Sequence, residues 1–128
     1  MTTNENPVCI IEDNLINRKI FTQMLKYGGF SSVDFQQGAD AIEWMKEHTP
    51  SCVVLDILMP KLSGEEILKL IRALPEGDKI PVVAVTALVQ ETEVNKFLQQ
   101  GFDGFIPKPA NLTTFANEVR EVIDKKKL

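Results

Sequence analysis

Polar side chains closely follow four short apolar runs of the sequence. They are Glu12 and Asp13, Asp56, Thr86, and Lys108. Three carboxylates held near one another repel, and their pKa values rise unless a cation joins them. Mg²⁺ is a suitable cation, because it prefers oxygen ligands and is usually held by one or two carboxylates plus a phosphate oxygen. These residues therefore predict a magnesium site that can receive a phosphoryl group.

Asp56 is the predicted nucleophile of this site. Carboxylates can form acyl phosphates, and phosphoryl transfer needs mainly in-line positioning and neutralisation of charge. Lys108 and Mg²⁺ would supply the neutralisation, while the Thr86 hydroxyl would donate a hydrogen bond to a phosphoryl oxygen. The formal charges of the three carboxylates, the lysine and the metal ion sum to zero, which favours the entry of an anionic group.

These residues can meet only if the apolar runs before them are neighbouring strands of one sheet. Runs of strand length alternate with stretches of helical period along the whole chain. Such alternation requires right-handed crossovers and a parallel sheet that is covered on both faces. We therefore expect an α/β fold: a doubly wound (βα)5 three-layer sandwich of flavodoxin-like type, with strand order 2-1-3-4-5. Ligands bind such sheets beyond the carboxyl ends of the strands.

Helices are expected between the strands, where apolar residues recur at three- and four-residue spacing. The predicted stretches are Leu15–Leu25, Ala41–Met45, Ile67–Ile71, Val94–Leu98 and Leu112–Ile123. Gly28 and Gly29 end the first helix, at a point where a left-handed residue is favoured, and Gly101 ends the fourth.

Composition excludes several classes of protein. A chain of 128 residues suits one domain, expected to span residues 1–128 with a core at about 8–124. The 14 basic and 18 acidic residues give a net charge of −4, so direct binding of nucleic acid is not expected. The polar start and the lack of a long apolar run predict a cytoplasmic protein without membrane insertion.

The two cysteines, Cys9 and Cys52, each lie four residues before a carboxylate of the predicted site. On neighbouring strands this shared offset predicts that the two thiols lie close together. Buried free thiols are expected here rather than a disulfide.

Four motifs of the sequence resemble those of the receiver domains of two-component response regulators, most closely the single-domain, chemotaxis-regulator-like type. The motifs are Ile10–Asn14, Val53–Pro60 continuing to Ser63-Gly64, Val83–Ala87 and Phe105–Pro109. They occur in the expected order and cover the chain from about Val8 to Asp124. The resemblance implies a phosphorelay protein that carries an aspartyl phosphate and needs Mg²⁺. It is a signalling phosphoacceptor, which catalyses only its own phosphorylation and dephosphorylation, and not an enzyme acting on other substrates.

The resemblance also implies a role for each matching residue. Asp56 is the phosphoacceptor, and Glu12, Asp13, Asp56 and the backbone carbonyl of Leu58 hold the metal. Thr86 and Lys108 contact the phosphoryl group, and Thr86 and Phe105 form the switch. The bond between Lys108 and Pro109 is cis in the family. Glu12 stands where Asp is more familiar, which leaves open whether it touches the metal directly or through water.

The implied partners are a sensor histidine kinase or histidine phosphotransfer protein and a downstream protein target. By resemblance, the donor contacts the exposed side of the first helix and the loop after the last strand, at Asn14, Leu15, Asn17, Arg18, Pro109 and Ala110. Output uses the face of helix four, strand five and helix five, and the protein is a monomer or a phosphorylation-dependent dimer.

Several other interpretations fit parts of the sequence. Asp13 or Asn14 could simply cap a helix. The chain could be a receiver cut from a hybrid histidine kinase, or a scaffold receiver that binds partners without phosphorylation. A phosphatase of the haloacid dehalogenase type would need a second acid at Leu58, and a flavodoxin-like flavin binder would need a glycine- and hydroxyl-rich loop in place of Glu12 and Asp13.

Overall fold

The computed structural model describes residues 6–57, 63–87, 95–96, 98–108, 111 and 113–127. Five strands within these residues form one sheet: β1 Val8–Ile11, β2 Ser32–Phe35, β3 Cys52–Asp56, β4 Val82–Thr86 and β5 Gly104–Pro107. Every neighbouring pair is parallel, and the order is β2-β1-β3-β4-β5. The predicted doubly wound sheet and its strand order are confirmed.

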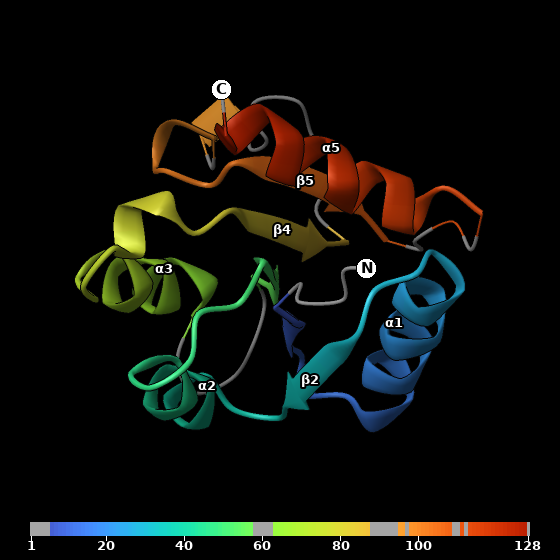
Figure 1. Ribbon diagram of the computed structural model, residues 1–128, viewed down its shortest axis with the longest axis horizontal. Helices are drawn as coiled ribbons and strands as arrows, with labels where there is room; N and C mark the ends of the chain where they lie inside the picture. Colours follow the sequence, from blue (N-terminus) through green and yellow to red (C-terminus); the bar gives the residue numbers. More distant parts are fainter. Residues whose placement is uncertain are drawn as a thin grey trace.

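Helices cover both faces of the sheet, as Figure 1 shows. They are α1 Leu15–Tyr27, α2 Gly38–Met45, α3 Gly64–Arg72 and α5 Phe115–Lys127, with a short 3-10 helix, η1, at Gly77–Lys79. The contacts pair α1 with α5 and α2 with α3, so each pair forms one outer layer of the sandwich. The predicted three-layer architecture follows from this arrangement.

The predicted fourth helix is only partly covered by the described residues. Residues 95–96 and 98–99 are helical and Gly101 has a φ of 113°, which agrees with an end at this glycine. Val94 and Phe97 lie outside the described residues, as does Leu112 of the last predicted helix.

The three central strands β1, β3 and β4 are buried along their whole length. This burial explains why their sequences are continuous apolar runs rather than alternating ones. Edge strand β2 is only partly buried, which fits its alternating sequence. The two sides of the sheet carry separate apolar cores, one under α2 and α3 and the other under α1 and α5.

The two cysteines are buried and free, as predicted, but the expected closeness of their thiols is wrong. The register pairs Cys9 with Val53 and Cys52 with Val8. Because successive side chains point to opposite faces of a strand, Cys9 belongs to one apolar core and Cys52 to the other. Burial also raises the pKa of the Cys9 thiol to about 12.

The start of α1 is fixed by Asn14, whose side chain accepts a hydrogen bond from the Asn17 backbone at 2.9 Å. This bond satisfies one of the free N–H groups of the first turn. Gly29 has a φ of 91° just after the helix, the left-handed conformation expected for the glycine pair. The cap therefore fixes Asn14, which directly follows Asp13, at the start of α1.

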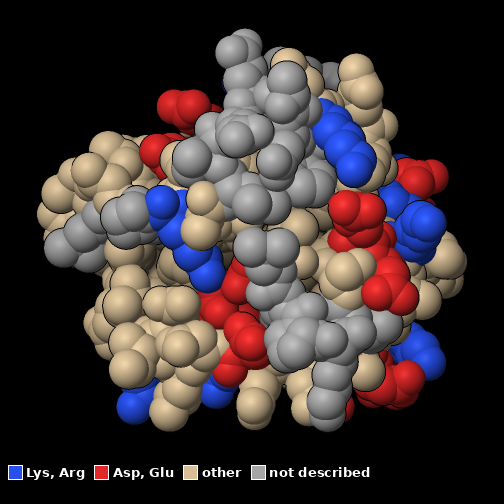
Figure 2. Space-filling view, turned by 180° about the vertical axis from the view of Figure 1, so that it is seen from behind, with Lys and Arg blue, Asp and Glu red and all other residues tan. Residues whose placement is uncertain are grey.

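Charges of both signs are mixed on the molecular surface. On the face drawn in Figure 2, acidic and basic side chains of the described residues lie next to one another. None of the helices within the described ranges is both long and apolar enough to span a bilayer.

The N-terminus of α3 packs closely against the backbone that follows Asp56. Ser63 and Glu66 form a reciprocal capping box, and the Gly64 N–H donates to the Ile57 carbonyl at 3.1 Å. A Cβ at Gly64 would lie 2.7 Å from the Ile57 Cα. Only glycine therefore permits this approach, which holds the end of β3 in place.

We predict that Gly64→Ala lowers the free energy of unfolding by about 1–3 kcal/mol, because the added methyl group forces the backbone apart. Lys69→Ala is the control in the same helix, because Lys69 is an exposed residue of α3. We expect the control to change stability by less than about 0.5 kcal/mol, helped by the better helix propensity of alanine. Urea unfolding curves measure both values, and equal losses in the two variants would contradict this account.

Candidate phosphoacceptor site

The sheet brings the predicted carboxylates together at one end. Glu12 directly follows β1, Asp56 is the last residue of β3, and these two strands are neighbours. Ligand oxygens of Glu12, Asp13 and Asp56 all lie within 4.8 Å of one another. The expected convergence of the three acids is therefore present in the fold.

Lys108 reaches these carboxylates from the opposite edge of the sheet. It directly follows β5, and its backbone N–H donates to the Thr86 carbonyl at 2.9 Å. Its Nζ lies 3.0 Å from Glu12 Oε1 and 3.1 Å from Asp56 Oδ2. One ammonium group thus bridges the acids of β1 and β3.

The site is largely shielded from water. Glu12 is 1% exposed and Asp56 is 5% exposed. Burial raises the pKa of Glu12 to about 6, although the hydrogen bond from Lys108 acts in the opposite direction. Burial alone would lower the pKa of Lys108, but its bonds to Glu12 and Asp56 outweigh burial and raise that pKa. The lysine is therefore charged and stabilises the two acids.

The loop that carries Glu12 and Asp13 is held by Arg18. Arg18 Nη1 donates to the Glu12 carbonyl at 3.0 Å and to the Asp13 carbonyl at 3.3 Å, and Nε pairs with Asp34 at 3.1 Å. The Arg18 side chain is only 12% exposed. Its expected place on the exposed side of α1 is therefore wrong: it is a structural support beneath the acidic pair. The Asn14 N–H fixes the other Glu12 oxygen, Oε2, at 3.2 Å.

Thr86 and Phe105 occupy neighbouring strands next to this cluster. Thr86 is the last residue of β4 and is fully buried. Phe105 lies in β5, where it is partly buried and packs against the apolar core under α2 and α3. Leu58, Pro109 and Ala110 lie outside the described residues, so the predicted carbonyl ligand, the predicted cis bond and part of the predicted donor contact are not placed.

The exposed side of α1 carries large apolar side chains, of which only Leu15 was expected to contact a partner. Leu15 is 54% exposed, Ile16 68% and Ile20 42%. Ile16 and Ile20 border a shallow groove of about 330 Å³ with Lys19, Gln23 and Met24. Asn14 and Asn17, which were expected to contact a partner, take part in the helix cap. The signal for Ile16 and Ile20 is their four-residue spacing, which places both on the same side of a helix.

The donor set suits a hard divalent cation. Three carboxylates and one lysine leave an excess of negative charge, which a divalent cation would compensate. Carboxylate oxygens in this number and spacing fit a small divalent ion that also keeps waters or a phosphate oxygen. The arrangement can therefore hold a metal ion beside a nearly buried Asp56.

Comparisons with known proteins agree with this geometry. The family model of the response regulator receiver domain matches residues 8–120. The polar-differentiation response regulator DivK of Brucella anthropi is 30% identical over 116 residues, which cover 91% of this chain and 94% of that protein.

Two solved structures share the fold at lower identity. The chemotaxis response regulator of Vibrio cholerae has a TM-score of 0.85 at 19% identity, with 93% of this chain and 99% of that chain covered. The receiver domain of a sensor histidine kinase from Pseudomonas aeruginosa, which holds a magnesium ion in its active-site cleft, has a TM-score of 0.83 at 22% identity, with 94% and 98% covered. The family match spans nearly the whole of the sheet and its acidic end, and the chain therefore belongs to the response regulator receiver domains.

Proposed function

We propose that this receiver domain takes a phosphoryl group onto Asp56 from a phosphohistidine of a sensor kinase or phosphotransfer protein, in a Mg²⁺-dependent reaction. The observation that carries the proposal is the Lys108 ammonium group between Asp56 and Glu12, next to Asp13. This arrangement offers a shielded nucleophile and a fixed positive charge at the place where a phosphoryl group would bind.

Glu12, Asp13 and Asp56 would hold the metal, together with the backbone carbonyl of Leu58 by resemblance. When bound, Mg²⁺ would neutralise charge on the carboxylates and on the incoming phosphoryl oxygens. The magnesium ion in the cleft of the Pseudomonas aeruginosa relative supports this assignment. The two bonds already made by Glu12, to Lys108 and to the Asn14 N–H, support a secondary role for it in metal binding.

Asp56, Lys108 and Thr86 have different roles in the transfer. A carboxylate oxygen of Asp56 attacks phosphorus in line, while the bond from phosphorus to the donor imidazole nitrogen breaks and the electron pair stays on that nitrogen. Lys108 stabilises the charge on the equatorial oxygens, and the Thr86 hydroxyl donates to one of them afterwards. The buried position of Thr86 at the end of β4, beside β5 and Phe105, supports a coupled movement of these two residues as the switch.

The switched surface in this proposal comprises the helical residues around 95–96 and 98–99 with β5 and α5. The partly buried position of Phe105 in β5 supports this choice, because a modest shift of its ring would alter the surface. A downstream protein reads the change, or the domain dimerises through it. We propose that the whole chain acts as this one unit in the cytoplasm.

The phosphodonor is proposed to dock on the exposed side of α1. Ile16 and Ile20 form an apolar strip that starts three residues after Asp13. Lys19 lines the same groove, and α1 carries no acidic side chain, so an apolar helix with acidic flanks would be complementary. This surface adds Ile16 and Ile20 to Leu15 of the expected donor contact.

The first test of this function is adduct formation with acetyl phosphate or beryllofluoride in the presence of Mg²⁺. We expect intact-mass spectrometry to detect one phosphoryl group on the wild type and on Asp40→Asn, an exposed acid of α2 that serves as the matched control. Asp56→Asn should give no adduct, because the nucleophile is lost. No adduct on the wild type, or an undiminished one on Asp56→Asn, would refute the proposal.

A second test uses the pH dependence of Mg²⁺ binding. The pKa of Glu12 near 6 means that this group is mostly protonated at pH 5 and ionised at pH 7. Because the metal competes with the proton, we expect the Kd for Mg²⁺ to fall roughly tenfold from pH 5 to pH 7 and to change little above it. Calorimetric titration of Glu12→Gln should give weaker binding with a flatter pH dependence. If the Kd of the variant changed with pH as steeply as the Kd of the wild type, the titrating group would not be Glu12.

A third test addresses the docking surface with a panel of phosphorylated histidine phosphotransfer domains. For the donor that reacts fastest with the wild type, we expect Ile16→Glu and Ile20→Glu to slow transfer at least tenfold, while phosphorylation by acetyl phosphate stays unchanged. Leu70→Glu is the matched control, because Leu70 on α3 is 42% exposed, as is Ile20. Equal slowing by the control, or none in the α1 variants, would exclude this surface.

A further inference from the structure

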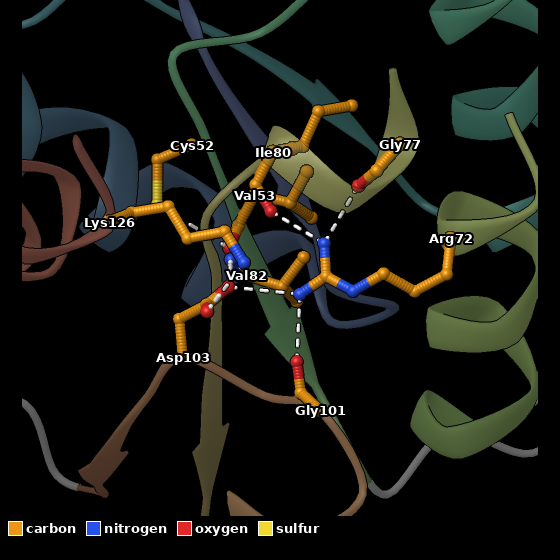
Figure 3. Close-up of polar contacts among 9 residues, drawn as sticks. All are labelled: Cys52, Val53, Arg72, Gly77, Ile80, Val82, Gly101, Asp103 and Lys126. Atoms are coloured by element: carbon orange, nitrogen blue, oxygen red, sulfur yellow. Dashed lines mark hydrogen bonds and ion pairs between the residues drawn. The ribbon is translucent and has the colours of Figure 1, made fainter. Parts of the chain in front are cut away.

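A second polar cluster lies at the opposite end of the sheet, around Arg72, the last residue of α3. Figure 3 shows its guanidinium group bridging several segments. Nη1 donates to the carbonyls of Gly77 and Ile80 at 2.8 and 2.7 Å. Nη2 donates to the carbonyl of Gly101 at 2.7 Å and to Asp103 Oδ2 at 2.9 Å. One side chain thus ties together the turn before β4 and the segment before β5.

Asp103 completes the cluster from the other side. Its Oδ2 also accepts the backbone N–H of Val82 at 2.9 Å, and its Oδ1 accepts the Lys126 ammonium at 2.9 Å. The Asp103 N–H in turn donates to the Val82 carbonyl at 2.8 Å. The side chains of Arg72 and Asp103 are 19% and 18% exposed, so water screens their ion pair only partly.

The cluster holds the starting ends of two strands whose other ends belong to the phosphoacceptor site. Val82 begins β4, which ends at Thr86, and Asp103 directly precedes β5, which is followed by Lys108. At about 3.3 Å per residue, these ends lie roughly 15 Å from the cluster. The acids Glu12 and Asp56, in contrast, are carried by β1 and β3. In the cluster drawn in Figure 3, no residue of these two strands bonds to the side chain of Arg72 or of Asp103.

We infer that Arg72 and Asp103 are positioning residues for phosphoryl transfer: they fix β4 and β5 against each other so that Thr86 and Lys108 meet Asp56. This inference rests on the proposed function. The planar guanidinium group suits the task, because its rigid fork bonds several acceptors at once, whereas a lysine is a single flexible point charge. Misplacement of a reacting group by 1 Å can cost about 100-fold in rate.

The inference predicts that two measurements on the full chain respond differently: the rate of adduct formation and the affinity for Mg²⁺. Arg72→Lys, Arg72→Met and Asp103→Asn should form the Asp56 adduct with acetyl phosphate at least about fivefold more slowly than the wild type. Their Mg²⁺ affinity should stay within about twofold, because the metal ligands are carried by β1 and β3. A loss of stability alone would lower the adduct rate and the Mg²⁺ affinity together, so it would not produce this difference.

Two controls identify a merely structural effect. Ile71→Ala removes a fully buried side chain of α3 beside Arg72 but none of the hydrogen bonds of the cluster, and should leave both values unchanged where circular dichroism shows the protein folded. Lys126→Met removes one partly buried partner of Asp103 but keeps every bond of Arg72, and should slow the adduct less than Arg72→Lys. Wild-type adduct rates in the Arg72 and Asp103 variants, or a parallel loss of metal affinity and rate as the signature of unfolding, would overturn the inference.

Hydrogen exchange tests the inference without phosphorylation. The Lys108 N–H bonds to the Thr86 carbonyl at 2.9 Å, and the Glu12 N–H bonds to the Phe35 carbonyl at 3.1 Å. The Arg72 and Asp103 variants should exchange the Lys108 amide several-fold faster while the Glu12 amide keeps its wild-type rate. Unchanged Lys108 exchange refutes the positioning role, whatever the wild type does with acetyl phosphate. A wild type that forms no adduct refutes only the proposed function.

Discussion

The ammonium group of Lys108, held at 3.0 Å from Glu12 and 3.1 Å from Asp56, is the interaction on which the site depends. Nearly buried carboxylates this close together are unfavourable alone, because desolvation and mutual repulsion both oppose their ionisation. The lysine compensates part of this cost, while burial raises the pKa of Glu12 to about 6. The remaining negative charge favours the binding of a divalent cation at these oxygens.

The fold holds the Lys108 side chain within bonding distance of Glu12 and Asp56. Lys108 stands after β5, two strands away from Asp56, so its position depends on the packing of β4 between them. At the near end, the bond from the Lys108 N–H to Thr86 joins β5 to β4. At the far end, Asp103 accepts a hydrogen bond from the Val82 N–H and so joins the starts of the same two strands, while Arg72 holds Asp103 by an ion pair. The site is thus held through the sheet rather than by its own contacts alone.

Much of this organisation could be predicted from the sequence, because parallel strands that are buried on both faces are continuous apolar runs and the residues after them must meet at one edge. That reasoning located Glu12, Asp13, Asp56, Thr86 and Lys108 and the order of the strands. It failed where the answer depended on register or side-chain direction. The thiols of Cys9 and Cys52 lie on opposite faces because the register pairs Cys9 with Val53, and no spacing rule decides that register. Arg18 points inward to carbonyl groups, and Arg72 bonds to Asp103, which lies 31 residues later in the sequence. No local pattern of the sequence indicates either contact.

The central claim, that Asp56 is the phosphoacceptor, is tested most directly by locating the phosphoryl group chemically. Borohydride reduces an acyl phosphate at aspartate to homoserine, and peptide mass spectrometry then identifies the position. The account predicts homoserine at residue 56 in the phosphorylated wild type and at no other acid. Homoserine at Asp13 or another aspartate, the corresponding five-carbon hydroxy amino acid at Glu12 or another glutamate, or a phosphoryl group on His48, the single histidine of the chain, would contradict it.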